Sequence, residues 1–165
     1  MVDSVSLDWS DSTQTICDPC CGSGMFLLAC AEKLQEYGHK PKHIVTKMLF
    51  GFDLDEVQIM TAKKALRMFC DVDSNIEKKD SLTVKNNFNT VLMNPPYSLG
   101  KKLLYKDFFK MALDMADEVH VVMPVNIESN STMHGNVNDL IHKHKLTEPE
   151  YVGDYFPNVG LSNIH

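Results

Sequence analysis

The 165-residue chain lacks any hydrophobic run long enough to cross a bilayer. Its longest uninterrupted apolar stretch, Met25–Ala31, is far shorter than the ~20 residues that a membrane-spanning helix needs. The first residues, Met1–Asp11, are acidic and polar, without the basic and apolar regions of a signal peptide. We therefore expect a cytoplasmic protein that makes no membrane contact.

The chain also lacks an excess of positive charge, with 16 Lys and Arg against 22 Asp and Glu and a net charge of -6. This balance excludes a simple basic protein that coats DNA, because such proteins neutralise many phosphates with Lys and Arg. It leaves open an enzyme whose grip on nucleic acid is local or supplied by a partner. The length and the 44% hydrophobic content fit one domain over residues 1–165, with a short N-terminal segment over 1–14.

Paired metal ligands are scarce as well. The five cysteines are odd in number, and the Cys17-x-x-Cys20 pair finds no second pair of Cys or His at zinc-site spacing. We therefore expect reduced thiols and no metal site.

What recurs along the chain is a short apolar run, then a turn, then a helical stripe. The expected strands are Gln14–Cys17, Lys47–Phe52, Asn89–Met93 and Val119–Met123. The expected apolar helix faces consist of Leu27, Cys30, Ala31 and Leu34; of Ile59, Ala62, Leu66 and Phe69; and of Leu104, Phe108, Met111 and Met115. This alternation predicts an α/β fold, with a mostly parallel sheet covered by helices on both faces. Ligands should then bind just after the carboxyl ends of the strands.

The first cluster at such a place is Asp18-Pro19-Cys20-Cys21-Gly22-Ser23-Gly24. A Gly-x-Gly turn before a helix lets a ligand approach backbone N–H groups. The third glycine of the dinucleotide fingerprint is replaced by Leu27, which disfavours a pyrophosphate. The carboxylate of Asp18 would repel phosphate but suits a ligand that carries an ammonium group. The alternative is a plain strand–helix turn.

Two acidic clusters follow the next strands. Asp53 could accept both hydroxyl hydrogens of a ribose, as an acidic residue does after the second strand of nucleoside-binding folds. Asp55 is better explained as the N-cap of the next helix. Asp80 could accept a hydrogen bond from an adenine amine, although by itself Lys79–Leu82 looks like any polar loop.

The sharpest signal is Asn94-Pro95-Pro96-Tyr97, directly after a strand. The prolines fix the backbone, so the Asn94 side-chain oxygen and the Pro95 carbonyl can both accept from one NH₂ group. Exocyclic amines of aromatic bases are poor nucleophiles because their lone pair is delocalised. Accepting both N–H bonds favours a more tetrahedral nitrogen, which frees that lone pair to attack a methyl group. Tyr97 offers a flat face for stacking; the alternative is a proline-stiffened turn.

Together, DPCCGSG and NPPY resemble the amino-methylating DNA methyltransferases, especially the adenine-specific enzymes of restriction-modification systems. The resemblance covers the chain from about Thr15 to Phe156. It implies a Rossmann-like, S-adenosylmethionine-dependent methyltransferase fold whose mostly parallel sheet ends in an antiparallel pair. It also implies methyl transfer to the exocyclic amine of an adenine flipped out of DNA, in a restriction-modification or phage-type enzyme.

The resemblance assigns roles to individual residues. The residues expected to hold S-adenosylmethionine are Asp18, Pro19, Cys20, Gly22, Gly24, Asp53, Leu54, Asp80, Ser81 and Asn94. The residues expected to hold and activate the target base are Asn94, Pro95, Pro96 and Tyr97. Within the first set, Asp18 and the glycines would line the methionine end. Leu54 would lie against the adenine ring of the cofactor.

Three features depart from the family pattern. The segment before Thr15 is short and polar, and we expect it to lack the N-terminal helix and motif that often cover the methionine moiety. We expect no target-recognition domain within residues 1–165; the motif order would place one after His165. The last antiparallel strand should be incomplete, since the chain stops near Ile164. We expect a minimal catalytic core that needs another segment or a specificity subunit to select DNA.

Several alternatives remain open. The Asn-Pro-Pro-Tyr chemistry also suits a protein glutamine amide or an RNA base amine, and a non-catalytic S-adenosylmethionine-binding subunit is a third possibility. The predicted catalytic loop, Asn94–Tyr97, is followed by four lysines: Lys101, Lys102, Lys106 and Lys110. The last three are spaced four residues apart. They form either a solvated helix face or a strip that contacts the phosphates of the nucleic acid.

Overall fold

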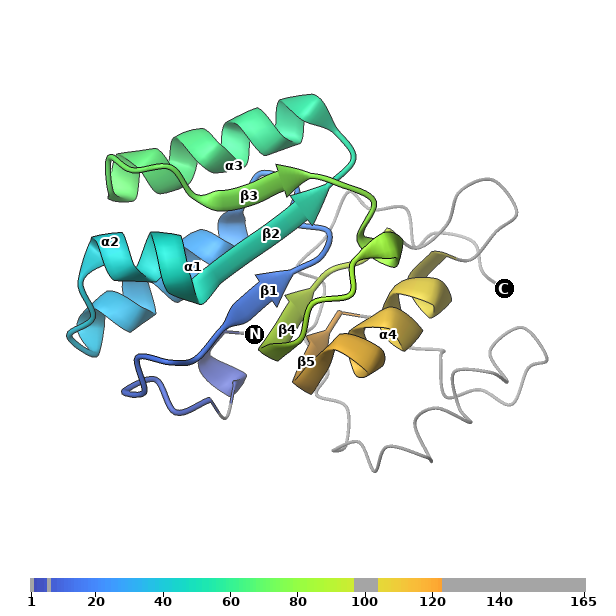
Figure 1. The fold of residues 1–165 in the computed structure, drawn as a ribbon, viewed down its shortest axis with the longest axis horizontal. Helices are drawn as coiled ribbons and strands as arrows, with labels where there is room; N and C mark the ends of the chain where they lie inside the picture. Colours follow the sequence, from blue (N-terminus) through green and yellow to red (C-terminus); the bar gives the residue numbers. More distant parts are fainter. Residues whose placement is uncertain (1, 6, 97–103, 123–165) are drawn as a thin grey trace, which may run out of the picture. The chain divides into compact units, whose positions relative to one another are not determined.

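The computed structural model describes residues 2–5, 7–96 and 104–122, which contain a five-stranded sheet. Its strands are β1 (Ile16–Asp18), β2 (Leu49–Asp53), β3 (Asn75–Lys78), β4 (Phe88–Met93) and β5 (Ala116–Val121), in the order β3-β2-β1-β4-β5 (Figure 1). All four pairings are parallel, with Ile16 opposite both Leu49 and Thr90. The predicted parallel α/β architecture is therefore confirmed. The expected antiparallel strand falls outside the described residues.

Three longer helices connect these strands: α1 (Met25–Glu36), α3 (Glu56–Phe69) and α4 (Leu104–Met115). The shorter helical turns are η1 (Val2–Ser4), α2 (Pro41–His43), the π-helical η2 (Ile44–Met48) and η3 (Ser81–Thr83). Figure 1 shows α1 and α3 beside β1–β3, and α4 beside β4 and β5. None of the described helices has the length and apolar character needed to span a membrane.

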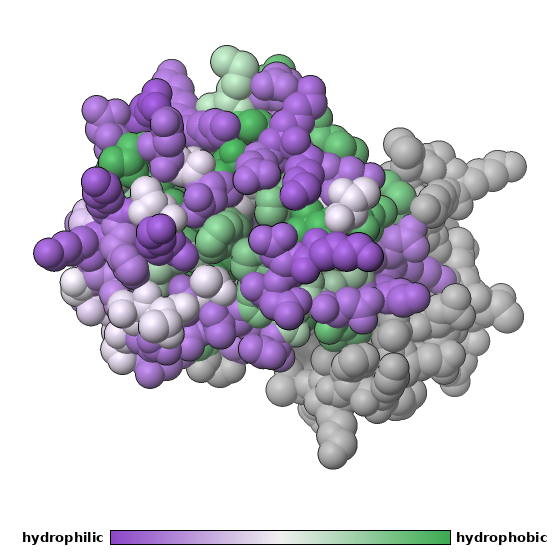
Figure 2. All heavy atoms as spheres, in the orientation of Figure 1, coloured by the Kyte–Doolittle hydropathy of each residue, from purple (hydrophilic) through white to green (hydrophobic). Residues whose placement is uncertain are grey.

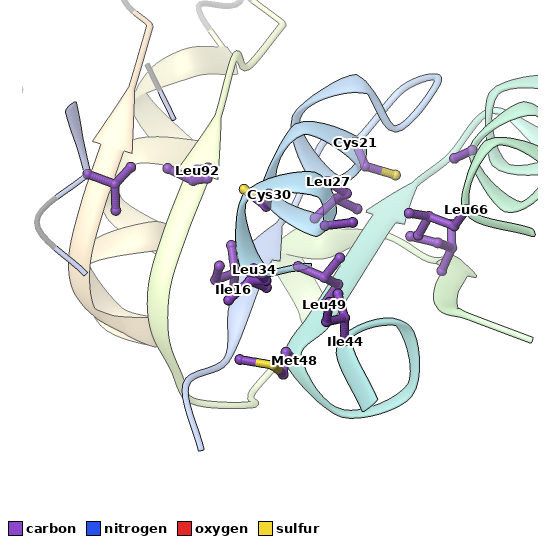
Figure 3. Close-up of a cluster of buried hydrophobic side chains, with 14 of the residues drawn as sticks. Ile16, Cys21, Leu27, Cys30, Leu34, Ile44, Met48, Leu49, Leu66 and Leu92 are labelled. Carbon is purple, nitrogen blue, oxygen red and sulfur yellow. The ribbon is translucent and has the colours of Figure 1, made fainter. Parts of the chain in front are cut away.

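One hydrophobic cluster joins α1 and α3 to the sheet (Figure 3). The predicted face of α1 is fully buried and consists of Leu27, Cys30, Ala31 and Leu34. These side chains pack on a sheet face that includes Ile16 and Leu49. Each fully buried Leu or Ile contributes about 1.5–3 kcal/mol from the removal of apolar surface from water. The 3.6-residue period therefore predicts this face of the core correctly.

The opposite face of the sheet is covered by α4, and here the predicted helix face was wrong. The buried residues of α4 are Tyr105, Phe109, Ala112 and Met115. The expected Leu104, Phe108 and Met111 are only half-buried, because the helix is turned by about one residue, roughly 100°, from the expected orientation. The strand that follows, β5, is half-buried rather than buried, since within the described sheet it pairs on one side only.

The N-terminal segment holds no α-helix among its described residues, but it belongs to the core. Val5, Leu7 and Trp9 are each less than one-tenth exposed. Lys33 of α1 lies 4.7 Å above the Trp9 ring and pairs with Asp3 at 3.0 Å. Apolar side chains at alternate positions of this segment therefore pack against α1. The segment looks polar in sequence because the residues between them are polar.

The surface of the described part is mainly hydrophilic on the face shown in Figure 2, with separate apolar patches. Among its exposed large apolar side chains, Val57, Met60 and Met68 lie on α3, and Leu54 lies just after β2. Leu54 is itself predicted to bind a ligand, and exposed Met25 and Leu82 directly follow the predicted ligand residues Gly24 and Ser81.

Gly24 allows the start of α1 to approach α3 closely. Its φ is +82°, and a Cβ there would lie 2.9 Å from the Cβ of Ala62. Gly38 also has a left-handed φ, +90°, but a Cβ there would meet nothing within 4 Å. The two glycines therefore share the backbone conformation and differ in packing.

We expect Gly38→Ala to lower the free energy of unfolding by about 1–2 kcal/mol, the cost of left-handed backbone for a residue with a Cβ. Gly24→Ala should lower the free energy of unfolding by about 1–3 kcal/mol more than Gly38→Ala does, because the new methyl group is too close to Ala62. Urea unfolding of both variants measures the difference. Equal losses would show that the contact between the helices tolerates the methyl group.

Candidate functional site

The predicted site residues follow the carboxyl ends of four parallel strands. The Asp18–Gly24 turn begins at the last residue of β1, Asp53 ends β2, Asp80 comes two residues after β3, and Asn94 follows β4. Since β1 lies between β2 and β4, the turn has the end of β2 on one side and the end of β4 on the other. The sheet therefore brings these residues to one edge, as the sequence predicts.

Two hydrogen bonds within the Asp18–Gly24 turn help to hold its shape. The N–H of Cys20 donates to Asp18 Oδ1 at 3.0 Å, and the N–H of Gly24 donates to the Cys21 carbonyl at 2.8 Å. Gly22 and Gly24 have φ values of +49° and +82°, which favour glycine. Gly24 is the N-cap of α1 and supplies no side-chain cap. The first turn of α1 can thus offer N–H groups to a polar ligand.

Asp18 is a buried carboxyl group, with 2% of its surface exposed. Burial raises its pKa to about 7, and the nearby Asp53 charge adds to the rise, while the hydrogen bond from Cys20 opposes it. Near neutral pH the group is therefore balanced between its protonated and ionised forms. A cation placed beside it would favour the ionised form.

The cysteines around the turn are free thiols. Burial raises the pKa of Cys21 and of Cys30 to about 12, and it raises the pKa of Cys17 and of Cys20 as well. These groups are therefore protonated thiols at neutral pH, and poor metal ligands in that form. In the described part of the chain, no three His, Cys, Asp or Glu side chains come together as a metal site would require.

Asp53 links two loops and keeps acceptor capacity. Its Oδ2 accepts from the N–H of Gly22, and its Oδ1 from the N–H of Asp55, both at 2.9 Å. A carboxylate offers about four lone-pair sites, so each oxygen can still accept from a ligand hydroxyl. Leu54 beside it is 65% exposed. Asp55 accepts from Val57 and caps α3, which confirms the predicted N-cap.

The residues after β3 differ in exposure. Asp80 is exposed, and its carboxylate accepts from the N–H of Leu82 at 3.1 Å to begin η3. Ser81 is buried, and its hydroxyl donates to the carbonyl of Pro19. Asp80 is thus open to a ligand at the surface, whereas Ser81 is enclosed by the protein.

Asn94-Pro95-Pro96 leaves β4 with Asn94 half-buried, Pro95 buried and Pro96 exposed. Tyr97, Lys101 and Lys102 lie outside the described residues. On α4, Lys106 is half-buried and Lys110 is exposed, and Lys110 lines a hollow together with Asp107 and Asp114. The described part of the expected basic strip therefore has acidic neighbours.

Sequence reasoning overlooked Gln58. Its side-chain oxygen lies 3.8 Å from the point where a Cβ on Gly22 would sit, so the first turn of α3 reaches the glycine turn. The sequence feature that could have indicated this contact is the position of Gln58, three residues after the N-cap Asp55 and on the exposed side of the helix.

Comparison with known proteins places this geometry among methyltransferases. The family model described as N-6 DNA methylase matches residues 2–124. The chain is 37% identical over 110 residues to the type II methyltransferase M.VspI of Vibrio sp. (strain 343), which covers 64% of this chain and 24% of that protein. The chain thus spans about a quarter of the length of this relative.

Solved structures share the fold at low sequence identity. The type I restriction enzyme EcoKI M protein has a TM-score of 0.62 at 14% identity, covering 81% of this chain and 37% of that one. Magnesium protoporphyrin IX methyltransferase of Synechocystis PCC 6803, solved with bound S-adenosylmethionine, has a TM-score of 0.58 at 11% identity, covering 83% and 61%. The fold is therefore the Rossmann-like fold of S-adenosylmethionine-dependent methyltransferases.

Asp18 should make stability depend on pH. Its folded-state pKa of about 7 lies above the usual 3.8, so the folded chain keeps a proton that the unfolded chain loses between these values. The free energy of unfolding then falls as pH rises from about 4 to about 7, by about 4 kcal/mol in total, and the loss persists at higher pH.

Asp18→Asn removes this titration and keeps an oxygen that can accept from Cys20. The variant should gain stability relative to wild type between about pH 4 and about pH 7, with no further gain above. Urea unfolding at several pH values measures this difference. A difference that does not change with pH would contradict the placement of Asp18 in a low-dielectric environment.

Proposed function

The chain belongs to the N-6 DNA methylase family, and we propose that it transfers a methyl group from S-adenosylmethionine to the exocyclic amine of an adenine flipped out of DNA. The observation that carries the proposal is the placement of the Asp18–Gly24 turn and Asn94 at the carboxyl ends of the adjacent parallel strands β1 and β4. Residues fit to hold a cofactor and residues fit to hold an amine thus lie side by side at one edge.

The cofactor half fits the polar groups of S-adenosylmethionine. Asp18 would face the ammonium of the methionine part, since a cation favours the ionised form of this buried carboxyl group. Asp53 would accept from the ribose hydroxyls with its remaining lone pairs. Exposed Leu54 would cover the adenine ring, and Asp80 would accept from its amine. When bound, this cofactor supplies an electrophilic methyl group on a positively charged sulfur.

The other half would prepare the target nitrogen. The Asn94 side-chain oxygen and the Pro95 carbonyl would each accept one N–H of the amine. That arrangement draws the nitrogen toward a tetrahedral geometry and frees its lone pair in the direction of the methyl group. The two prolines keep these acceptors in fixed positions, which lowers the entropy cost of reaching the transition state. Tyr97 would stack on the flipped base.

We further propose that DNA recognition draws on another segment or subunit. The net charge of -6 is unfavourable for gripping a duplex alone, and the chain matches only a part of M.VspI and of the EcoKI M protein. The local grip would come from Lys101, Lys102 and Lys106 after the catalytic loop. A protein glutamine amide and an RNA base amine are the competing substrates.

We expect Asn94→Ala to lower methyl transfer at saturating cofactor by about 10²–10³-fold, because its acceptor acts mainly in the transition state. The dissociation constant for S-adenosylmethionine should stay within about twofold of wild type. Transfer of labelled methyl to adenine-containing DNA, to RNA and to a glutamine peptide is measured beside calorimetric titration of the cofactor.

Asn87→Ala is the matched control, since Asn87 is an exposed asparagine just before the other end of β4. It should leave both binding and transfer unchanged. Wild-type transfer by the Asn94 variant would refute the catalytic assignment. Transfer to RNA or to the peptide alone would replace DNA as the substrate.

Asp53→Ala should weaken cofactor binding by about tenfold or more, because the ribose loses a charged acceptor. Asp55→Ala should instead lower the free energy of unfolding by about 1 kcal/mol, through loss of the α3 N-cap, with binding within about twofold of wild type. Calorimetric titration and urea unfolding separate the two effects. Equal binding by wild type and Asp53→Ala would remove the ribose assignment.

A further inference from the structure

Ser81 makes a contact that the strand order alone would not produce. It is the first residue of η3, just beyond β3, and its hydroxyl donates to the carbonyl of Pro19 in the turn after β1. β1 and β3 are not neighbours, because β2 lies between them. Strands two apart are separated by about 10 Å, so the contact must reach across the carboxyl end of β2.

Within the described part of the chain, this contact is the one side-chain hydrogen bond between the turn after β1 and the segment after β3. The turn is also joined to β2, since the N–H of Cys21 donates to the Phe52 carbonyl and that of Gly22 to Asp53 Oδ2, both at 2.9 Å. The segment after β3 is joined to β2 by the N–H of Lys79, which donates to the Asp53 carbonyl at 2.9 Å. Ser81 closes this set of contacts into a ring around the end of β2.

The Pro19 carbonyl depends on Ser81. Pro19 is buried, it has no N–H of its own, and Ser81 is the only donor to its carbonyl among the described residues. A buried carbonyl that loses its partner costs about 1–3 kcal/mol. Without the hydroxyl, the turn would regain that free energy by moving its backbone toward water.

We propose that Ser81 is a positioning residue that holds the Asp18–Gly24 turn in its ligand-binding conformation before any ligand arrives. The residue is 4% exposed and its single hydroxyl proton is used by Pro19, so it is buried with no donor left for a ligand and acts through the turn. The consequence for S-adenosylmethionine rests on the proposed function; the consequence for the ligand-free turn does not.

The same short helix provides a matched control. The hydroxyl of Thr83 donates to the Asp80 carbonyl at 2.6 Å, within η3 itself, and Thr83 is exposed. Ser81→Ala and Thr83→Ala each remove one hydrogen-bonded hydroxyl from η3, but only the first removes the link to Pro19. Ser81→Cys keeps a side chain of similar volume with a weaker hydrogen-bond donor. If Ser81→Ala does not fold, Ser81→Cys is compared with Thr83→Ala in its place.

The experiment measures amide hydrogen exchange of the full ligand-free chain, the dissociation constant for S-adenosylmethionine, and methyl transfer at saturating cofactor. In Ser81→Ala, the amides of residues 20–24 should exchange at least about tenfold faster, while those of β4 stay unchanged. The dissociation constant should rise about tenfold with little change in the maximal rate. For Ser81→Cys, the exchange rates and the dissociation constant should lie between those of wild type and Ser81→Ala. Thr83→Ala should match wild type in both.

Unchanged exchange at residues 20–24 would overturn the proposal, and weakened binding with unchanged exchange would make Ser81 a direct ligand contact. Faster exchange throughout the sheet would reduce Ser81 to a general contribution to stability. If the wild-type chain does not bind S-adenosylmethionine, the proposed function fails, while the exchange measurement still decides whether Ser81 positions the turn.

Discussion

The parallel pairing of β1 with both β2 and β4 is the constraint on which the rest of the structure depends. Ile16 lies opposite Leu49 on one side and Thr90 on the other, so the three central strands point the same way. Whatever follows each strand must then emerge at one edge. The short segments that follow β1, β2 and β4 are far apart in the sequence, yet they meet at this edge and form one site. The helices α1 and α3 on one face, and α4 on the other, keep the strands buried and the edge free.

At that edge the polar groups first satisfy one another. Asp53 accepts from the backbone of two loops, and Ser81 of a third loop donates to the turn after β1. Such contacts order the loops while leaving lone pairs on the Asp53 carboxylate for a ligand. Asp18 shows what the arrangement costs, because its burial holds a carboxyl group where the charged form is poorly stabilised. A cationic ligand would bind more favourably as a result, since its charge would stabilise the ionised form of Asp18.

Periodicity and turn chemistry predicted the helices and strands with a long or strongly apolar pattern. The buried face of α1 and the Asp55 cap followed from spacing alone. The strand β3 was overlooked because only Ile76 of its four residues is buried, which leaves no alternation to detect. The face of α4 was misplaced because apolar residues surround much of that helix, and tertiary packing selected among them. The contact of Ser81 with Pro19 joins residues 62 apart, and no local pattern encodes it.

The central position of β1 also governs the order in which the chain can fold. Its pairing with β2 closes a loop of about 30 residues between Ile16 and Leu49, whereas its pairing with β4 joins Ile16 and Thr90, which are 74 residues apart. Closing the longer loop costs more entropy, and contacts of high sequence separation slow folding. The ends of β1 and β2, which carry Asp18 and Asp53, are therefore joined at a lower entropy cost than the ends of β1 and β4. The half of the site that carries Asn94 thus costs more loop-closure entropy to assemble, and only β5 lies beyond it in the described sheet.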